Sequence, residues 1–319
     1  MSESLISVIV LTYKSGEFLY ETLDSVFAQN HSKIELIVAD DGSPDFDIDR
    51  VQQYIQEHAK DNIVNSVVLD NKINRGTVKN INSALDVVQG DYINIIAGDD
   101  TYASNDVFSR QADYLDSHEE MLVVGNIIEC DEHMNDVGRV GFAPCGKLNM
   151  LKASREKLLR FVCKKMSSLL ATQATCYRRQ FFIQTGQFDE RFKLIEDFPT
   201  TVRIITNNYP IGYFDISVVK HRSGTGVSTS NKAFDIGKIK YYSDLKLFYE
   251  CYLMPISPIV GRLFVKMRHR MCCFRIDYSL AKSENKSKSY LFGIVARNVL
   301  PLFYYFLTNF KRVKFFLNK

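Results

Sequence analysis

Two pairs of aspartates stand at the ends of apolar, strand-like runs of this sequence. Asp40 and Asp41 follow the run ELIVA, and Asp99 and Asp100 come one residue after the run DYINIIA. In an open α/β sheet, ligands bind beyond the carboxyl ends of the strands. Acids gathered at two such ends would repel one another unless a ligand filled the crevice between them. Capping of the following helices is the other role open to them, but two pairs at two strand ends favour a ligand site.

The chemistry of these side chains suits a nucleotide diphosphate and a cation. Asp40 and Asp41 could accept hydrogen bonds from a base N–H and from ribose hydroxyls, and Tyr13 could stack on the base. Asp99 and Asp100 could hold a divalent cation, which would neutralise the diphosphate. The sequence therefore predicts a nucleotide site at one edge of a sheet.

The elements that would position these residues alternate between strands and helices over the first 130 residues. Ser7–Thr12 is a continuous apolar run typical of a strand buried on both faces, and Thr12 and Tyr13 stand at its end, beside the predicted site. Alternation with short connections predicts a parallel, doubly wound α/β sheet. The expected strands are 7–12, 35–39, 66–69, 91–97 and 121–128, and the expected helices are 18–27, 49–59, 77–88 and 104–118.

Past about residue 130 the alternation weakens. The patterns there predict an amphipathic helix over 151–166, a strand over 171–178, a helix over 196–207 and a strand over 213–219. The chain after about residue 232 is expected to be mostly helical. Soft boundaries therefore fall near residues 100 and 230.

Charge is distributed unevenly along the chain. The whole sequence has a formal net charge of +3, but Pro255–Lys319 holds 13 Lys and Arg against two acids, which leaves −8 on the rest. The longest apolar run of this tail, Val299–Leu307, has nine residues and includes a proline, so it is too short to span a bilayer. Basic residues beside aromatic ones predict docking on an anionic membrane surface. The alternative is a helical subdomain that packs its aromatic side chains on the rest of the chain.

Motifs that the sequence lacks exclude several other classes. It has no G-x-x-x-x-G-K-[ST], no G-x-G-x-x-G after the first strand and no G-x-S-x-G, which argues against an ATPase, a Rossmann dehydrogenase and an α/β-hydrolase. No nucleic-acid-binding motif accompanies the basic tail, so no nucleic acid partner is expected. The seven cysteines form no C-x-x-C and no signal peptide opens the sequence. These features predict a cytoplasmic protein with reduced thiols.

Several short motifs in a fixed order resemble the donor half of the family 2 glycosyltransferases. They are VIVLTY at 8–13, DDGS at 40–43, NRG at 74–76, and GDYI at 90–93 leading into the second aspartate pair. GQFDE at 186–190 and the following acidic pair match the acceptor half more loosely. The resemblance implies a GT-A fold, in which a doubly wound, Rossmann-like nucleotide-binding sheet carries an acceptor-side half and a helical C-terminal extension. It implies a nucleotide-sugar donor half over 1–100, an acceptor half over 101–230 and a helical, basic C-terminal region over 231–319.

The resemblance also implies roles for individual donor-site residues. Tyr13 and Asp41 would hold the nucleotide base. Arg75 and Lys79 are candidates for the diphosphate, with a solvated helix face as the alternative.

A divalent cation, Mn²⁺ or Mg²⁺, is the cofactor that the resemblance implies. Asp99 would face the ribose or the metal, and Asp100 would face the metal. Many relatives have a further Asp two residues before this pair, where this chain has Ala97, so either aspartate could be the ligand. His221 follows a predicted strand, near a point where many relatives have a His or Arg that touches the metal or the diphosphate. A structural histidine is the alternative.

Glu196 and Asp197 match the acidic pair that precedes the acceptor-side helix of the family. In inverting transfer, the acceptor oxygen attacks the anomeric carbon from the face opposite the leaving diphosphate, and one carboxylate takes its proton. Asp197 is the predicted base and Glu196 its alternate. Without the resemblance, both acids would be read as partners of the helix dipole.

The predicted activity is inverting transfer of a hexosyl or N-acetylhexosaminyl group from a nucleotide-diphosphate donor, a UDP-sugar. The predicted acceptor is a hydroxyl of a glycan or lipid-linked glycan in capsular, O-antigen or exopolysaccharide synthesis, at the inner face of the cell membrane. A sugar-nucleotidyltransferase is one alternative, although TYKSG at 12–16 poorly matches its Gly-rich loop. The other alternative is an inactive glycan- or nucleotide-binding module, against which the retained acidic pairs argue.

Overall fold

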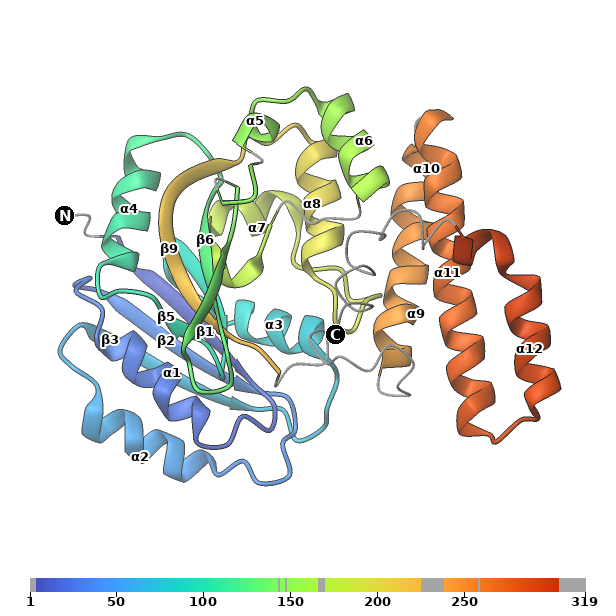
Figure 1. The fold of residues 1–319 in the computed structure, drawn as a ribbon. Coiled ribbons are helices and arrows are strands. Elements are labelled where there is room, and N and C mark those ends of the chain that lie inside the picture. Colours follow the sequence, from blue (N-terminus) through green and yellow to red (C-terminus); the bar gives the residue numbers. More distant parts are fainter. Residues whose placement is uncertain are drawn as a thin grey trace. The chain divides into compact units, whose positions relative to one another are not determined.

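The computed structural model describes residues 4–142, 144–146, 148–165, 170–224, 238–257 and 259–303 (Figure 1). The chain divides into two compact units. Unit 1 comprises Met1–Arg155 and Ser168–Thr229, and unit 2 comprises Glu156–Ser167 and Ser230–Lys319. The predicted donor and acceptor halves both contribute strands to the sheet of unit 1.

Four parallel strands form the first part of that sheet, in the spatial order β3-β2-β1-β4. Nearly every residue of the first two strands is buried, because helices cover both faces of the sheet, and this explains their continuous apolar runs. The parallel arrangement predicted from the sequence is therefore confirmed for this part. The four strands are β1 (Ile6–Thr12), β2 (Ile34–Asp40), β3 (Ile63–Asp70) and β4 (Tyr92–Ala97).

Past β4 the sheet becomes mixed, which the alternation of strands and helices did not indicate. β8 (Thr175–Arg178) runs antiparallel to both its neighbours, β4 and β6 (Leu122–Cys130). β9 (Gly212–Arg222) lies parallel to β6. The strand expected over 171–178 is shorter, since residues 172–174 form a 3₁₀ turn. Two further strands were not predicted: β5 (Thr101–Tyr102), which pairs with β9, and β7 (Asp136–Val140), which pairs with β6.

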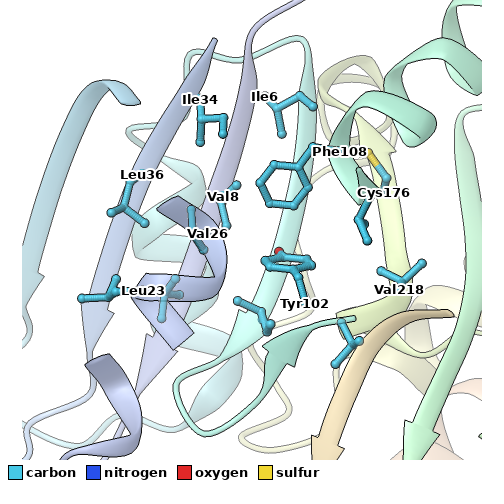
Figure 2. Packing of buried hydrophobic residues seen from close by; sticks show 14 of the residues in the cluster. Ile6, Val8, Leu23, Val26, Ile34, Leu36, Tyr102, Phe108, Cys176 and Val218 are labelled. Atoms are coloured by element: carbon cyan, nitrogen blue, oxygen red, sulfur yellow. The ribbon is translucent and has the colours of Figure 1, made fainter. Parts of the chain in front are cut away.

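Amphipathic helices hold the core of unit 1. In α1 (Phe18–Phe27), Leu23 and Val26 face the sheet, three residues apart, as one side of a helix requires. Figure 2 shows both side chains among the buried residues of this core, with Val26 beside Val8 of β1. Burial of each such side chain stabilises the fold by about 1.5–3 kcal/mol. α2 (Ile48–His58) and α4 (Val107–Ser117) share this face of the sheet, while α3 (Thr77–Leu85) packs on β1 and β2.

The remaining helices of unit 1 follow the mixed part of the sheet. The single helix expected over 151–166 is two helices, because a turn closed by Ala153 N–H on the Met150 carbonyl ends the first of them. The helix expected over 196–207 is present with slightly narrower bounds. These helices are α5 (Leu148–Leu151), α7 (Arg179–Thr185) and α8 (Asp197–Thr206); α6 (Arg155–Lys165) belongs to unit 2 from Glu156 onward.

Unit 2 is helical over its described residues, as the sequence predicts for this region. A cation–π contact of 4.9 Å between Arg275 of α11 and the Tyr242 ring of α9 joins two of its helices. Among the described residues, no helix combines the length and apolar composition that crossing a membrane requires. Residues 304–319 of the predicted interfacial tail lie outside the described residues. Besides α6, the described helices of this unit are α9 (Ile239–Phe248), a π-helical turn (Tyr249–Leu253), α10 (Met254–Ile256), α11 (Ile259–Ser283) and α12 (Lys288–Arg297).

Candidate functional site

The carboxyl ends of β1, β2 and β4 lie side by side at one edge of the sheet. Thr12 is in register with Asp40, and the Asp41 N–H donates to the Thr12 carbonyl at 3.0 Å. Gly98, which leads from β4 into the second aspartate pair, donates to the Leu11 carbonyl at 2.7 Å. We call this set the polar edge, and it consists of Thr12, Tyr13, Asp40, Asp41, Asp99 and Asp100.

Asp40 organises the loops at the polar edge. Its fully buried carboxylate accepts hydrogen bonds from the backbone N–H of Ser43 at 2.7 Å and from the Ser43 hydroxyl at 2.5 Å. The same hydroxyl accepts from the Lys14 N–H at 2.8 Å. Asp40 thereby ties the loop after β2 to the loop after β1, in addition to its predicted role toward the donor.

Asp41 fixes the loop that precedes α3. Its carboxylate, only 4% exposed, accepts from the backbone N–H groups of Arg75 and Gly76, each at 2.8 Å. Burial raises the pKa of Asp41, although these two hydrogen bonds oppose the rise. Each carboxylate oxygen has a second lone pair, so the group can also accept from a base N–H.

Two glycines allow these loops to approach each other closely. At Gly42 a Cβ would lie 2.6 Å from the backbone nitrogen of Asn74, and at Gly76 it would lie 2.7 Å from the carbonyl oxygen of Lys193. Both glycines have positive φ, +74° and +93°, which side chains disfavour. The Gly76 contact joins the donor-side loop to the segment that leads into α8.

Tyr13, Arg75 and Lys79 present exposed side chains near the polar edge. The Tyr13 ring is 46% exposed, so its surface is available for stacking. Arg75 Nη2 donates to Asn71 Oδ1 at 2.6 Å. Lys79 Nζ lies 3.9 Å from Glu190 Oε2, and both side chains are about half exposed; such a pair contributes little stability. The predicted diphosphate roles of Arg75 and Lys79 stay predictions.

Asp100 and His221 meet at the polar edge although 121 residues separate them. His221 Nδ1 lies 3.0 Å from Asp100 Oδ1, which also accepts from the backbone N–H of Arg222 at 2.9 Å. Burial raises the pKa of Asp100, whose side chain is 1% exposed, and the hydrogen bond to Asp100 raises the pKa of His221. A buried carboxylate needs such a positive or donating partner.

The donor set at this point suits Mn²⁺ or Mg²⁺ chemically. The Asp100 carboxylate contacts the imidazole of His221 at the end of β9, and Asp99 precedes Asp100 in the same turn. Carboxylate and imidazole groups bind divalent cations, and phosphate oxygens of a substrate commonly complete such sites. Within the described residues no cluster of three or more His, Cys, Asp or Glu side chains is preassembled as a metal site.

Arg222 is a residue that the sequence analysis missed. It is 3% exposed, its guanidinium lies 4.1 Å from the centroid of the Phe18 ring, and it forms an ion pair with Glu21 at 2.5 Å. Its Nε donates to the Asp99 carbonyl at 3.1 Å, and its Nη1 donates to the Glu132 carbonyl at 2.7 Å. Arg222 therefore holds the aspartate turn against α1. Its position directly after His221 is the one signal that could have indicated this role.

The acidic pair, Glu196 and Asp197, opens α8. Asp197 Oδ1 accepts from the Phe198 N–H at 2.9 Å, and Glu196 immediately precedes the helix. Burial raises the pKa of Glu196. Burial raises the pKa of the Tyr177 hydroxyl in β8, and the nearby charges of Glu196 and Asp197 raise it further.

The loop ahead of the acidic pair is fastened to α3. The Asn82 side chain donates to the Phe188 carbonyl at 2.9 Å and accepts from the Phe188 N–H at 3.1 Å. The Val78 N–H donates to the Lys193 carbonyl at 3.2 Å. One helix thus connects the loop that Asp41 holds with the loop that leads into the acidic pair.

Comparison with known proteins gives the context for this geometry. Residues 7–185, more than half of the chain, match the model of a family described as Glycosyl transferase family 2. An uncharacterized glycosyltransferase of Haemophilus influenzae is 28% identical over 168 residues, which cover 52% of this chain and 65% of that protein. The match therefore spans just under two thirds of that relative. The uncharacterized glycosyltransferase EpsJ of Bacillus subtilis is 24% identical over 258 residues, covering 78% of this chain and 70% of EpsJ.

Two solved structures share the fold. TarS 1–349 of S. aureus in complex with UDP-GlcNAc has a TM-score of 0.56 at 19% identity, covering 85% of this chain and 72% of TarS 1–349. The mannosyltransferase PcManGT from Pyrobaculum calidifontis, in complex with GDP-Man and Mn²⁺, has a TM-score of 0.58 at 16% identity, covering 94% of this chain and 80% of that one. Both are GT-A glycosyltransferases, so the predicted GT-A fold with C-terminal helices is confirmed.

Proposed function

This chain belongs to the family 2 glycosyltransferases, and from that premise we propose that it catalyses inverting transfer from a UDP-sugar to a glycan hydroxyl. One observation carries the proposal furthest. Asp41 holds the backbone of Gly76, and Gly76 packs against the Lys193 carbonyl, three residues before Glu196. A nucleotide-binding edge and a pair of candidate bases are thereby joined through backbone contacts.

The donor is proposed to be a UDP-hexose or a UDP-N-acetylhexosamine. Tyr13 would stack on the base, while Asp41 would accept from its N–H and Asp40 and Thr12 would line the site. Arg75 and Lys79, both exposed beside α3, would contact the diphosphate. Support comes from the polar edge itself and from the UDP-GlcNAc that TarS 1–349 binds.

A divalent cation, Mn²⁺ or Mg²⁺, is the proposed cofactor. Asp99, Asp100 and His221 would hold it, with Arg222 fixing the turn that carries the two aspartates. When bound, the cation would stabilise the negative charge that develops on the leaving diphosphate. The Mn²⁺ in the PcManGT complex supports this proposal.

Asp197 is proposed as the general base, with Glu196 as its alternate. During transfer the acceptor oxygen forms a bond to the anomeric carbon, the bond from that carbon to the diphosphate breaks, and the acceptor proton passes to a carboxylate. The N-terminus of α8 favours the ionised form of Asp197, which is the form that accepts a proton. Burial raises the pKa of Glu196, and a carboxylate with a raised pKa is a suitable alternate base.

The acceptor is proposed to be a glycan, or a lipid-linked glycan at the inner face of the cell membrane, in capsular, O-antigen or exopolysaccharide synthesis. The family resemblance and the basic unit 2 support this choice. Screening the purified chain with Mn²⁺ or Mg²⁺ against a panel of nucleotide sugars, with released nucleotide as the readout, tests the activity.

Faster release of UDP from one UDP-sugar than from the others is the expected result, with Asp61→Asn, an exposed surface change, as the unaffected control. Pyrophosphate release from a nucleoside triphosphate and a sugar phosphate would instead indicate a sugar-nucleotidyltransferase. Nucleotide binding without any release, across donors and acceptors, would indicate an inactive binding module.

A further inference from the structure

The second helix of the α11–α12 hairpin in unit 2 has a small core with its partner. Leu291, Ile294 and Val295 of α12 pack with Met271 and Phe274 of α11. This contact covers only one side of α12.

Four large apolar side chains remain exposed, one on α12 and three on the helical residues after it. Phe292 is 72% exposed, Val299 57%, Leu300 65% and Phe303 60%, and residues 299–303 are helical. α12 ends at Arg297 and Asn298 is not helical, so Phe292 lies on α12, while Val299, Leu300 and Phe303 lie together on the helical residues after it. We call this set the apolar face. It has no packing partner among the hydrophobic clusters of the described residues.

Exposed cations lie on the same hairpin as the apolar face. Lys286, Lys288 and Arg297 are exposed on or beside α12. The hairpin as a whole, residues 259–303, contains nine Lys and Arg against two acids. A cleft of about 550 Å³ between its helices is lined by Arg270, Lys286 and Arg297, with Asp277 and Glu284 as the two acids. The hairpin therefore combines an exposed apolar stripe with a strong positive charge.

We propose that the apolar face of α12 docks on the surface of an anionic phospholipid bilayer. Phe292, Leu300 and Phe303 would enter the boundary between headgroups and acyl chains, and the exposed cations of the hairpin would contact the lipid phosphates. Charge selects this occupant over a second copy of the chain, because a dimer through this face would bring two strongly basic hairpins together. The docking deepens the proposed use of a lipid-linked acceptor and rests on it for its purpose, but its test needs no transfer.

Sedimentation of the full chain with lipid vesicles tests the proposal. The chain is expected to bind vesicles that contain phosphatidylglycerol and to bind pure phosphatidylcholine vesicles weakly. Raising the salt from about 0.1 M to about 1 M shortens the screening length about threefold, so binding should weaken while the apolar contribution remains. The triple variant Lys286→Gln, Lys288→Gln, Arg297→Gln should lose about 10²-fold in binding at the lower salt and much less at the higher salt.

A second triple variant, Phe292→Ser, Leu300→Ser, Phe303→Ser, should lose at least about tenfold at both salt concentrations. Ile183→Ser in α7 is its matched control, because Ile183 is 65% exposed, as Leu300 is. Unchanged melting temperatures would show that the variants are folded. Failure of the full chain to bind anionic vesicles, or wild-type binding by the second triple variant, overturns the proposal. A dimer that this variant converts to a monomer would assign the face to a second copy and overturn it too. Nucleotide release without vesicles is a separate measurement, so loss of one result does not imply loss of the other.

Discussion

The polar edge of unit 1 and the apolar face of unit 2 differ in how their charged groups are held. At the polar edge, Asp40, Asp41 and Asp100 each accept at least two hydrogen bonds from within the chain. Around the apolar face, Lys288 and Arg297 are exposed to solvent. Groups with fixed positions suit one ligand of defined shape, whereas exposed flexible cations suit a surface whose phosphates have no fixed arrangement. Changes at the polar edge should therefore alter chemistry and stability together, and changes at the apolar face should alter neither.

Loss of the proposed general base should have the largest effect on the rate of transfer. Asp197→Asn is expected to lower transfer by about 10²–10⁴-fold, because the amide cannot take the acceptor proton. Nucleotide affinity, measured by calorimetry with UDP, should stay near that of the wild type, since the base acts on the acceptor. Near wild-type transfer by Asp197→Asn would move the role to Glu196, for which Glu196→Gln is the corresponding variant.

Removal of the proposed cation, or of a side chain proposed to hold it, should have the second-largest effect on the rate of transfer. Asp100→Ala should lower turnover by about 10²-fold or more, as loss of a preorganised electrostatic group does. Excess EDTA should abolish transfer by the wild type, and Mn²⁺ or Mg²⁺ should restore it. Full activity in excess EDTA would remove the cation from the proposed function.

Gly76→Ala should show that the link between the donor-side loop and α8 is backbone against backbone. A Cβ there meets the Lys193 carbonyl at 2.7 Å, in a backbone conformation that disfavours side chains, so a loss of about 3 kcal/mol in the free energy of unfolding is expected. Gly186→Ala is the control: φ is +79° and nothing lies within 4 Å of its Cβ, so only the backbone strain of about 1–2 kcal/mol should appear. Equal losses in denaturant unfolding would mean that the Lys193 contact is unimportant.

Arg222→Gln should lower the stability of the fold more than the same change at an exposed arginine. Loss of the guanidinium leaves the Asp99 and Glu132 carbonyls without their donor, so unfolding should become easier by about 2 kcal/mol. Arg50→Gln is the matched control: Arg50 also pairs with a glutamate of the same region and lies over a ring, that of Tyr20, but both members of its pair are more than half exposed. Its effect should stay below about 0.5 kcal/mol. Similar melting temperatures for the two variants would contradict the clamping role of Arg222.

The smallest expected effect is a pH dependence of the stability of the fold, caused by Glu196. Burial raises the pKa of this acid in the folded chain, so its ionisation is more costly there than in the unfolded chain. The stability that it contributes is present below the unfolded pKa and is lost as pH rises through the folded pKa. Glu196→Gln should therefore match the wild type near pH 4 and become progressively more stable than it toward pH 8. Glu119→Gln, at an exposed position, should show no such trend in thermal unfolding.

The sequence predicted the parallel part of the fold because its signal is local. β1 and β2 are unbroken apolar runs, and the polar residues at their ends lie where parallel strands bring them together. The antiparallel β8 has only four residues and takes its place between β4 and β6 through long-range pairing. No periodicity in four residues can report which strands will flank them.

The candidate site also has parts that the sequence indicated and parts that it could not indicate. Motif resemblance indicated Asp41, Asp100 and His221 as site residues, but it could not show that the imidazole and the carboxylate contact each other across 121 residues. The sequence also could not indicate that Arg222 is buried, because arginine is a residue type that is usually exposed. Its contacts come from α1, from the turn after β4 and from the residues after β6, three segments far apart in the sequence.

The glycines at the polar edge have a consequence for directed evolution of donor preference. Gly42 and Gly76 face backbone atoms at 2.6 and 2.7 Å, and a neighbouring backbone cannot rotate aside as a side chain can. A mutant library that randomised either position would consist mainly of destabilised members. Diversity is better placed at Tyr13, Arg75 and Lys79, whose side chains are exposed. Changes in nucleotide preference should therefore be selected from substitutions at these three positions, on a loop framework that selection leaves unchanged.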